Sequence, residues 1–245
     1  MLTEMSPSFL QVCKLYWDSA QKEYPDDVDL FRYIVMNKSD YYRYILSKLR
    51  DEDNAYSHFY SKLERDTGVI FKLLLDVDNE DKRHPLKTEE RYPKLKERWD
   101  GMRLFMYTFW DSIEVYFSGK GFHIYVYTPA TKFDTVRDAR DDLYLNLTTW
   151  LQSYYDKGVF LSLDRECRIP MSKHSKFDWA PEEPPRWKVP VNYKMSIDDI
   201  LARSFSPQNY ILEFHRAFMR PIRPIPWQTF LKSPSQFVLG QPQQA

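Results

Sequence analysis

The sequence predicts a fold that combines α-helices and β-strands, of the α/β or α+β class. Segments with helical periodicity alternate with short apolar runs of strand length, and 245 residues are enough to bury a full core. Hydrophobic residues make up 43% of the chain and charged residues 29%, as is typical of folded proteins. The formal net charge of +0 excludes a globally basic nucleic-acid-binding protein, so any basic patch must be local.

Cysteine content and hydropathy limit the setting of the protein. The two cysteines, Cys13 and Cys167, exclude a disulfide framework and a four-cysteine zinc site. They favour a reduced, intracellular setting, cytoplasmic for a prokaryotic, plasmid or viral protein and nuclear otherwise. No apolar run approaches the roughly 20 residues that a membrane-spanning helix needs, so we expect no membrane partner.

The N-terminal part is expected to alternate helices with strands. Pro7 suits the first turn of a helix, and Leu10, Leu15 and Trp17 give that helix an apolar side. The expected elements are a helix over 6–24, a strand over 30–36, a helix over 39–52 and a strand over 55–63.

The next strand ends in two aspartates. The apolar run Val69–Leu75 predicts a buried strand, followed by Asp76, Val77 and Asp78. Side chains two residues apart on a strand share a face, so both carboxylates should lie side by side while Val77 enters the core. Two ionised carboxylates repel unless a cation lies between them, which favours a Mg²⁺ or Mn²⁺ site, although a polar turn is the plain alternative.

The middle of the chain predicts a helix and then a hairpin. Residues 79–100 are densely charged and contain Pro85 and Pro93, so we expect a loop followed by a helix near 92–110. Two alternating apolar strands over 112–128 flank a short turn at 118–121, which predicts a hairpin.

The last elements of the expected core lead to a basic loop. We expect a helix over 135–158, a strand over 159–164 that ends at Asp164, and a basic loop over 165–179. Most of the 16 prolines follow, in 181–245, where helices are expected over 197–205 and 209–218 before a tail or linker.

Three strand ends therefore present polar groups in sequence order. They are Asp76 with Asp78, the segment 118–123 and Asp164. Two-metal phosphoryl transfer needs carboxylates for the metal ions and cations for a triphosphate. The candidate cations are Lys120, His123, Arg168, Lys173, His174 and Lys176.

In this order the motifs resemble those of the archaeo-eukaryotic primase superfamily, and of the catalytic small subunit of archaeal and eukaryotic DNA primase in particular. The matching stretches are "LLLDVD", "FSGKGFHIYV", "SLD" and "RIPMSKHSK", with "AYSHFY" upstream. The similarity spans roughly residues 10–180. It implies an α+β fold: a primase catalytic core over 1–180, with an α/β-like mixed sheet flanked by helices and an RRM-like module. Residues 181–245 would form a proline-rich helical extension packed on that core.

The resemblance also implies a role for each matching residue. Template-directed transfer would make short RNA or DNA primers on single-stranded DNA, from NTPs or dNTPs. Catalytic Mg²⁺ or Mn²⁺ ions would bind Asp76, Asp78 and Asp164. Contacts to the nucleotide would come from Ser118, Lys120, His123, Arg168, His174 and Lys176. Lys120 stands where many relatives carry arginine, so it would act as a point charge.

The chain departs from the cellular subunits in one respect. The interval 79–111 holds no cysteine, so no structural zinc is expected, and a minimal primase, or the catalytic domain of a longer protein, is favoured. A large primase subunit or a helicase or accessory domain is a candidate partner. Initiation without a primer needs a second nucleotide site, which we expect on a partner or within 180–245.

Three alternatives remain open on the residues alone. An end-joining polymerase of the same superfamily would also suit the "SGKGFHIYV" motif. A metal-dependent nuclease would use the same carboxylates, but it has no need for a triphosphate cradle. A catalytically inactive nucleic-acid-binding module would bind without incorporating nucleotides, yet it gains nothing from clustered carboxylates.

Overall fold

The structure is a computed structural model. It describes residues 57–59, 69–77, 87–132, 166–168, 170–171, 173, 186–226 and 229. Outside the described residues lie the helices expected over 6–24, 39–52 and 135–158 and the strands expected over 30–36 and 159–164. No helix in the described ranges combines the length and the apolar character needed to cross a membrane.

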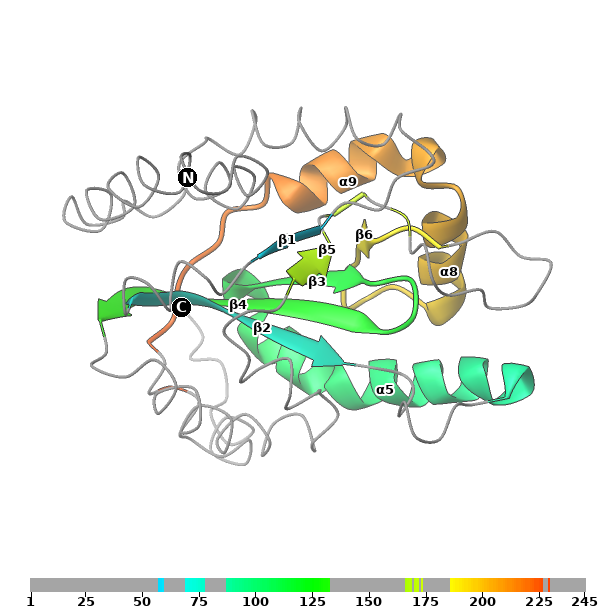
Figure 1. The fold of residues 1–245 in the computed structure, drawn as a ribbon, viewed down its shortest axis with the longest axis horizontal. Coiled ribbons are helices and arrows are strands. Elements are labelled where there is room, and N and C mark those ends of the chain that lie inside the picture. Colours follow the sequence, from blue (N-terminus) through cyan, green and yellow to red (C-terminus); the bar gives the residue numbers. More distant parts are fainter. Residues whose placement is uncertain are drawn as a thin grey trace, which may run out of the picture.

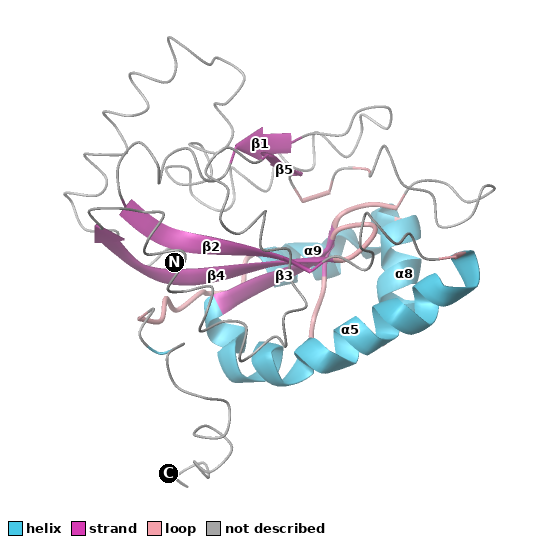
Figure 2. Ribbon diagram, turned by 60° about the horizontal axis from the view of Figure 1, so that its bottom comes forward, coloured by secondary structure: helices cyan, strands magenta, loops and turns pink. Residues whose placement is uncertain are grey.

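A four-stranded antiparallel sheet forms the centre of the described structure (Figures 1 and 2). Its strands, in spatial order, are β2 (Val69–Val77), β4 (Phe122–Lys132), β3 (Ile113–Phe117) and β6 (Val189–Pro190). The fold is therefore of the α+β class. The described strands pair only in the antiparallel sense, so they do not include the parallel pairing that a mixed sheet requires.

A second, two-stranded sheet joins segments that are distant in sequence. β1 (Ser57–Phe59) pairs with β5 (Glu166–Arg168) in antiparallel register. β1 lies within the strand expected over 55–63. The expectation of a loop over 165–179 is wrong at 166–168, because pairing with β1 gives this short segment an extended conformation that its own sequence does not indicate.

The hairpin expected over 112–128 is confirmed, with β3 and β4 joined by a tight turn. The Ser118 backbone N–H donates to the Gly121 carbonyl at 2.8 Å, and the Gly121 N–H donates to Ser118 Oγ at 3.1 Å. Gly119 has a φ of 93°, in the left-handed region that a residue with a Cβ disfavours. The glycine and the serine hydroxyl thus hold the turn in one shape.

Helix α5 (Thr88–Phe109) lies along one face of the sheet (Figure 2). It begins at Thr88, before the expected start near 92, and it contains Pro93. The Lys87 backbone N–H donates to the Glu90 carboxylate at 2.9 Å and closes the first turn. A proline this close to the N-terminus removes one backbone hydrogen bond, and the packing of the rest of the helix compensates for that loss.

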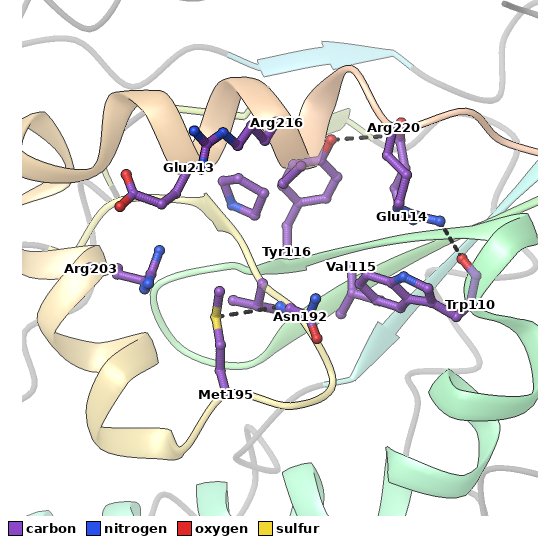
Figure 3. A pocket seen from close by; sticks show the side chains of 13 residues that line it. Trp110, Glu114, Val115, Tyr116, Asn192, Met195, Arg203, Glu213, Arg216 and Arg220 are labelled. Atoms are coloured by element: carbon purple, nitrogen blue, oxygen red, sulfur yellow. Dashed lines mark hydrogen bonds between the residues drawn. The ribbon is translucent and has the colours of Figure 1, made fainter.

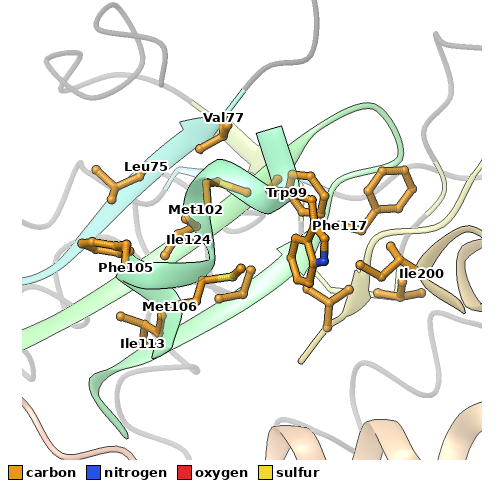
Figure 4. Close-up of a cluster of buried hydrophobic side chains, with 14 of the residues drawn as sticks. Leu75, Val77, Trp99, Met102, Phe105, Met106, Ile113, Phe117, Ile124 and Ile200 are labelled. Carbon is orange, nitrogen blue, oxygen red and sulfur yellow. The ribbon is translucent and has the colours of Figure 1, made fainter. Parts of the chain in front are cut away.

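The main core lies between α5 and the sheet (Figure 4). Alternate strand residues point toward α5 and are fully buried; they include Leu75, Val77, Phe117, Phe122 and Ile124. From α5, Trp99 stacks on Phe122 with ring centroids 5.0 Å apart, and its indole N–H donates to the Met195 carbonyl at 3.0 Å. Val77 therefore enters the core as expected.

The C-terminal helices continue the same core. The expected helices at 197–205 and 209–218 are confirmed as α8 (Ile197–Phe205), a 3₁₀ turn η3 (Pro207–Tyr210) and α9 (Ile211–Phe218). In Figure 1 the sheet lies between α5 and α9. Buried residues of both C-terminal helices join the main core; they are Ile197, Ile200, Phe214 and Phe218. The boundary expected between 180 and 181 stays a prediction, and β6 and these helices share the sheet and core of the preceding residues.

Candidate functional site

The face of the sheet opposite α5 carries a row of polar and aromatic side chains. Because side chains alternate along a strand, the residues between those of the main core point to this second face. Asp76 of β2 is the register partner of His123 on β4, and His123 is the register partner of Tyr116 on β3. Three neighbouring strands thus place an acid, an imidazole and a phenol side by side.

Asp76 and His123 form the centre of this row. His123 Nε2 lies 3.5 Å from Asp76 Oδ1, close enough for an ion pair when the imidazole is protonated. The Asp76 side chain is 17% exposed and that of His123 is 10% exposed, so His123 is buried and Asp76 is the more accessible of the two. The expectation that the strand continues past the apolar run is confirmed as far as Val77, so Asp76 is held by sheet pairing. Asp78 lies outside the described residues, and its position beside Asp76 stays a prediction.

The turn of the β3–β4 hairpin adjoins the same end of the sheet. Val77 pairs with Phe122, the first residue after the turn, so the end of β2 meets the turn directly. Lys120 in this turn is half-buried. Ser118 is buried, and its hydroxyl oxygen accepts the Gly121 N–H that shapes the turn. Of the residues expected to hold nucleotide phosphates, Ser118, Lys120 and His123 are therefore brought to the end of the sheet where Asp76 lies.

The segment after β5 is tied to the chain that leads into β6. Arg168, expected in a loop, belongs to β5 and pairs with Ser57. Met171 follows with a φ of 62° and donates its backbone N–H to the Lys188 carbonyl at 2.7 Å. Lys173 forms an isolated bridge with Trp187, and its ammonium lies 5.4 Å from the centre of the Trp187 ring.

Three further predicted site residues lie outside the described part of the chain. They are Asp164, His174 and Lys176. Their approach to Asp76 stays a prediction.

Lys188 is a site residue that the sequence analysis missed. It is fully buried, and its ammonium donates to the Tyr125 hydroxyl at 2.9 Å. The ammonium also lies 5.3 Å from the ring centre of Tyr116 and 5.0 Å from that of Tyr125. Tyr116 is the register partner of His123, and Tyr125 follows His123 by two residues on the same face. Lys188 is therefore packed against two tyrosines that neighbour His123 in the sheet.

A sequence signal for Lys188 existed. It stands between Trp187 and Val189 in a short apolar run, "WKVPV", where alternation places it on the face opposite to theirs. A lysine in such a run is normally read as a solvent-exposed residue. In the described part of the chain, its ammonium lies against Tyr116 and Tyr125, which belong to other strands.

The described residues match part of a divalent-metal site. Asp76 offers a partly exposed carboxylate, the hard oxygen donor that Mg²⁺ and Mn²⁺ take. Within the described ranges no group of three histidine, cysteine, aspartate or glutamate side chains is arranged to hold a metal ion. The other two predicted ligands, Asp78 and Asp164, lie outside those ranges.

Comparison with known proteins gives no relative for this chain. No family model matches it, and no match is found among curated proteins or solved structures.

Proposed function

We propose that this protein is a primase/polymerase of the archaeo-eukaryotic primase superfamily, which makes short primers by template-directed nucleotidyl transfer on single-stranded DNA. One observation carries the proposal. Asp76, His123 and the turn that holds Lys120 occupy one end of an antiparallel sheet, with Asp76 and His123 as register partners. Residues of two motifs that are more than 40 positions apart in sequence thus meet where a metal-bound triphosphate would need a carboxylate and cations.

The substrate would be an NTP or a dNTP bound across this end of the sheet. His123 would contact its phosphates while Asp76, 3.5 Å from Nε2, holds the imidazole in place. Lys120 would add a positive charge from the turn, and Arg168, His174 and Lys176 would complete the phosphate contacts.

The reaction would join the 3′-oxygen of a primer, or of a first nucleotide, to the α-phosphorus of the incoming nucleotide. The bond from the α-phosphorus to the bridging oxygen would break, and pyrophosphate would leave. Mg²⁺ or Mn²⁺ held by Asp76, Asp78 and Asp164 would lower the pKa of the attacking hydroxyl and neutralise the triphosphate. The chain's own cations would offset the charge that develops on the leaving group.

Nucleotide incorporation on single-stranded DNA tests the proposal. Labelled NTPs or dNTPs are supplied with Mg²⁺ or Mn²⁺, on unprimed and primed templates, to wild-type protein and to Asp76→Asn. The matched control is Asp100→Asn, since Asp100 is exposed on α5, away from the site. We expect products from wild type and from the control, and none from Asp76→Asn.

The other outcomes separate the alternatives. Synthesis only at a gap with a 5′-phosphate would favour the end-joining polymerase. Degradation of the DNA would favour the nuclease. A folded wild-type protein that binds DNA and incorporates nothing would refute the proposal and leave the binding module.

A further inference from the structure

Three aromatic rings lie in a row at the end of β3 that is away from the hairpin turn. Tyr107 comes from α5, Trp110 from the 3₁₀ turn η2 (Trp110–Ser112) and Tyr193 from the chain that follows β6. The ring centres of Tyr107 and Tyr193 are 5.8 Å apart, and those of Tyr193 and Trp110 are 5.1 Å apart. The catalytic proposal does not use these three residues, which we call the aromatic row.

The aromatic row is held in one geometry, and its outermost ring is open to solvent. The rings meet at 75° and 68°, a stable edge-to-face arrangement in which no ring lies flat between the other two. Arg220 lies over the Trp110 ring at 4.2 Å and donates to the Trp110 carbonyl at 2.5 Å, which fixes this end of the row. Tyr193 and Trp110 are half-buried, whereas Tyr107 is 68% exposed. A flat ligand can therefore stack on Tyr107 with little reorganisation of the protein.

Positive charge accompanies the rings. The exposed ammonium of Lys194 lies 5.7 Å from the centre of the Tyr193 ring. On α5, Lys96 and Arg103 share a single carboxylate, that of Asp100, at 2.6 and 3.3 Å. Two cations on one acid leave one positive charge in excess, and the exposed Arg103 lies one turn before the first ring of the row.

An exposed acid, Asp111, also lies in this region, directly after Trp110. The Arg223 backbone N–H donates to the Asp111 carbonyl at 2.7 Å, so an exposed arginine is its neighbour. The opposite charges of these two residues cancel in the net charge of the region. The excess that comes from Lys194 and from α5 therefore remains.

Trp110 also lines a pocket of about 330 Å³ between β3, α8 and α9 (Figure 3). The charged residues of its lining are three arginines and two glutamates: Arg203, Arg216, Arg220, Glu114 and Glu213. Figure 3 shows these groups on both sides of Tyr116, so neither end of the pocket is purely apolar. The arginines exceed the glutamates by one, which extends the positive field from the aromatic row toward the C-terminal helices.

The aromatic row and the candidate catalytic end lie at opposite ends of β3. Trp110 precedes the strand, and the turn that holds Lys120 follows it. A strand rises about 3.4 Å per residue, so the five residues of β3 separate the two ends by about 17 Å. The row is therefore a surface of its own rather than a part of the proposed triphosphate site.

We propose that the aromatic row binds single-stranded nucleic acid, with bases stacked on the rings and phosphates beside the neighbouring cations. Unpaired bases present the flat faces that stacking on aromatic side chains needs, whereas the bases of a duplex cover one another. The phosphates complement the excess positive charge. This deepens the proposed function and rests on it, because the bound strand would be the DNA template, held at a distance from the catalytic end.

Fluorescence anisotropy with a chelator and without nucleotides tests binding independently of catalysis. The full chain is titrated into labelled oligothymidylate, oligouridylate and a DNA duplex, each of about 20 nucleotides. We expect wild type to bind the single strands more tightly than the duplex. We expect Tyr107→Ala to bind them at least about fivefold more weakly, as for the loss of one stacked base, and Tyr107→Phe, which keeps the ring, to retain the tighter binding. Tyr107 is exposed, so both variants should fold.

Lys194→Gln tests the phosphate contact. We expect its slope of log affinity against log salt to be less steep by about 0.7, the value for one phosphate contact on a single strand. The matched control is Lys87→Gln, which removes the same charge from an exposed position at the other end of α5. Twenty residues of helix separate Lys87 from Tyr107, about 30 Å, so the control should keep the wild-type slope.

The remaining outcomes separate this surface from the catalytic proposal. Equal affinity of Tyr107→Ala and Tyr107→Phe, or a duplex bound as tightly as a single strand, would overturn the assignment even if wild type incorporates nucleotides. A protein partner would then be the ligand of the row. Tighter binding of oligouridylate than of oligothymidylate would keep the surface and refute its role in holding a DNA template. Binding that depends on Tyr107, in a protein that incorporates nothing, would keep the surface and refute the catalytic proposal.

Discussion

Removal of the Tyr125 hydroxyl should destabilise the protein through the buried Lys188 ammonium. In Tyr125→Phe the aromatic ring remains under the ammonium, but the acceptor 2.9 Å from Nζ is lost. Hydrogen bonds to charged groups contribute about 1.5–3 kcal/mol, and Lys188 is fully buried, so water cannot replace the lost acceptor. For a chain of 245 residues, each kcal/mol shifts Tm by roughly 2–4 °C, so we expect a decrease of about 3–12 °C.

The assay is urea unfolding followed by circular dichroism, together with calorimetry for Tm. The matched control is Tyr107→Phe, because Tyr107 is 68% exposed on α5 and water can satisfy its hydroxyl. We expect the control to unfold like wild type. If Tyr125→Phe also unfolds like wild type, the Lys188–Tyr125 bond does not stabilise the fold and the reasoning is wrong.

Three further predictions follow from the core, a helix terminus and the proposed metal site. Trp99→Ala should lower the free energy of unfolding by about 3–5 kcal/mol, because Trp99 is fully buried. The control is Leu104→Ala, which should change this free energy little because Leu104 is half-exposed. If both variants unfold at similar urea concentrations, the packing described for Trp99 is wrong. Ser196→Ala should destabilise α8 at neutral pH, because the hydrogen bond that the Ser196 hydroxyl donates to the Asp199 carboxylate lowers the pKa of Asp199 below its ordinary 3.8. A lowered carboxyl pKa stabilises the folded state at pH values above the ordinary pKa, and this stabilisation is lost as the pH falls through the lowered pKa. The difference in Tm between wild type and Ser196→Ala should therefore become smaller in thermal melts at acid pH. A Tm difference that does not change with pH would contradict this prediction. Asp76→Asn should keep the wild-type Tm, while its rate of nucleotide incorporation should fall by more than about a hundredfold. A rate near that of wild type would show that Asp76 is not a metal ligand.

Much of the described architecture is visible in the sequence, because it arises from local patterns. Alternating apolar residues around 118–121 predict the β3–β4 hairpin, and the amphipathic segment at 197–205 predicts α8 within the same bounds. The placement of Val77 in the core follows from strand alternation alone. The start of α5 is not visible in the same way, because the charged segment before Pro93 has no apolar periodicity. The helix includes Pro93 because the packing of its remaining residues compensates for one missing backbone hydrogen bond.

Elements that depend on distant partners could not be found in this way. The three-residue strand β5 exists because it pairs with β1, more than 100 residues away in sequence. The sequence contains no information about that pairing in the neighbourhood of Glu166. Strand formation in such short segments follows the partner rather than intrinsic propensity.

By itself, the sequence of this protein determined the order of its motifs, the strand that carries Asp76 and the hairpin that carries His123. Those features depend on side-chain alternation and turn chemistry within a few residues. Only the tertiary structure decided that Asp76 and His123 are register partners, that Lys188 is buried against Tyr116 and Tyr125, and that Arg203 and Arg216 line one pocket. The physical reason is that register, burial and pocket shape result from contacts between segments far apart in the chain. Such contacts are selected by the packing of the whole core rather than by any local pattern.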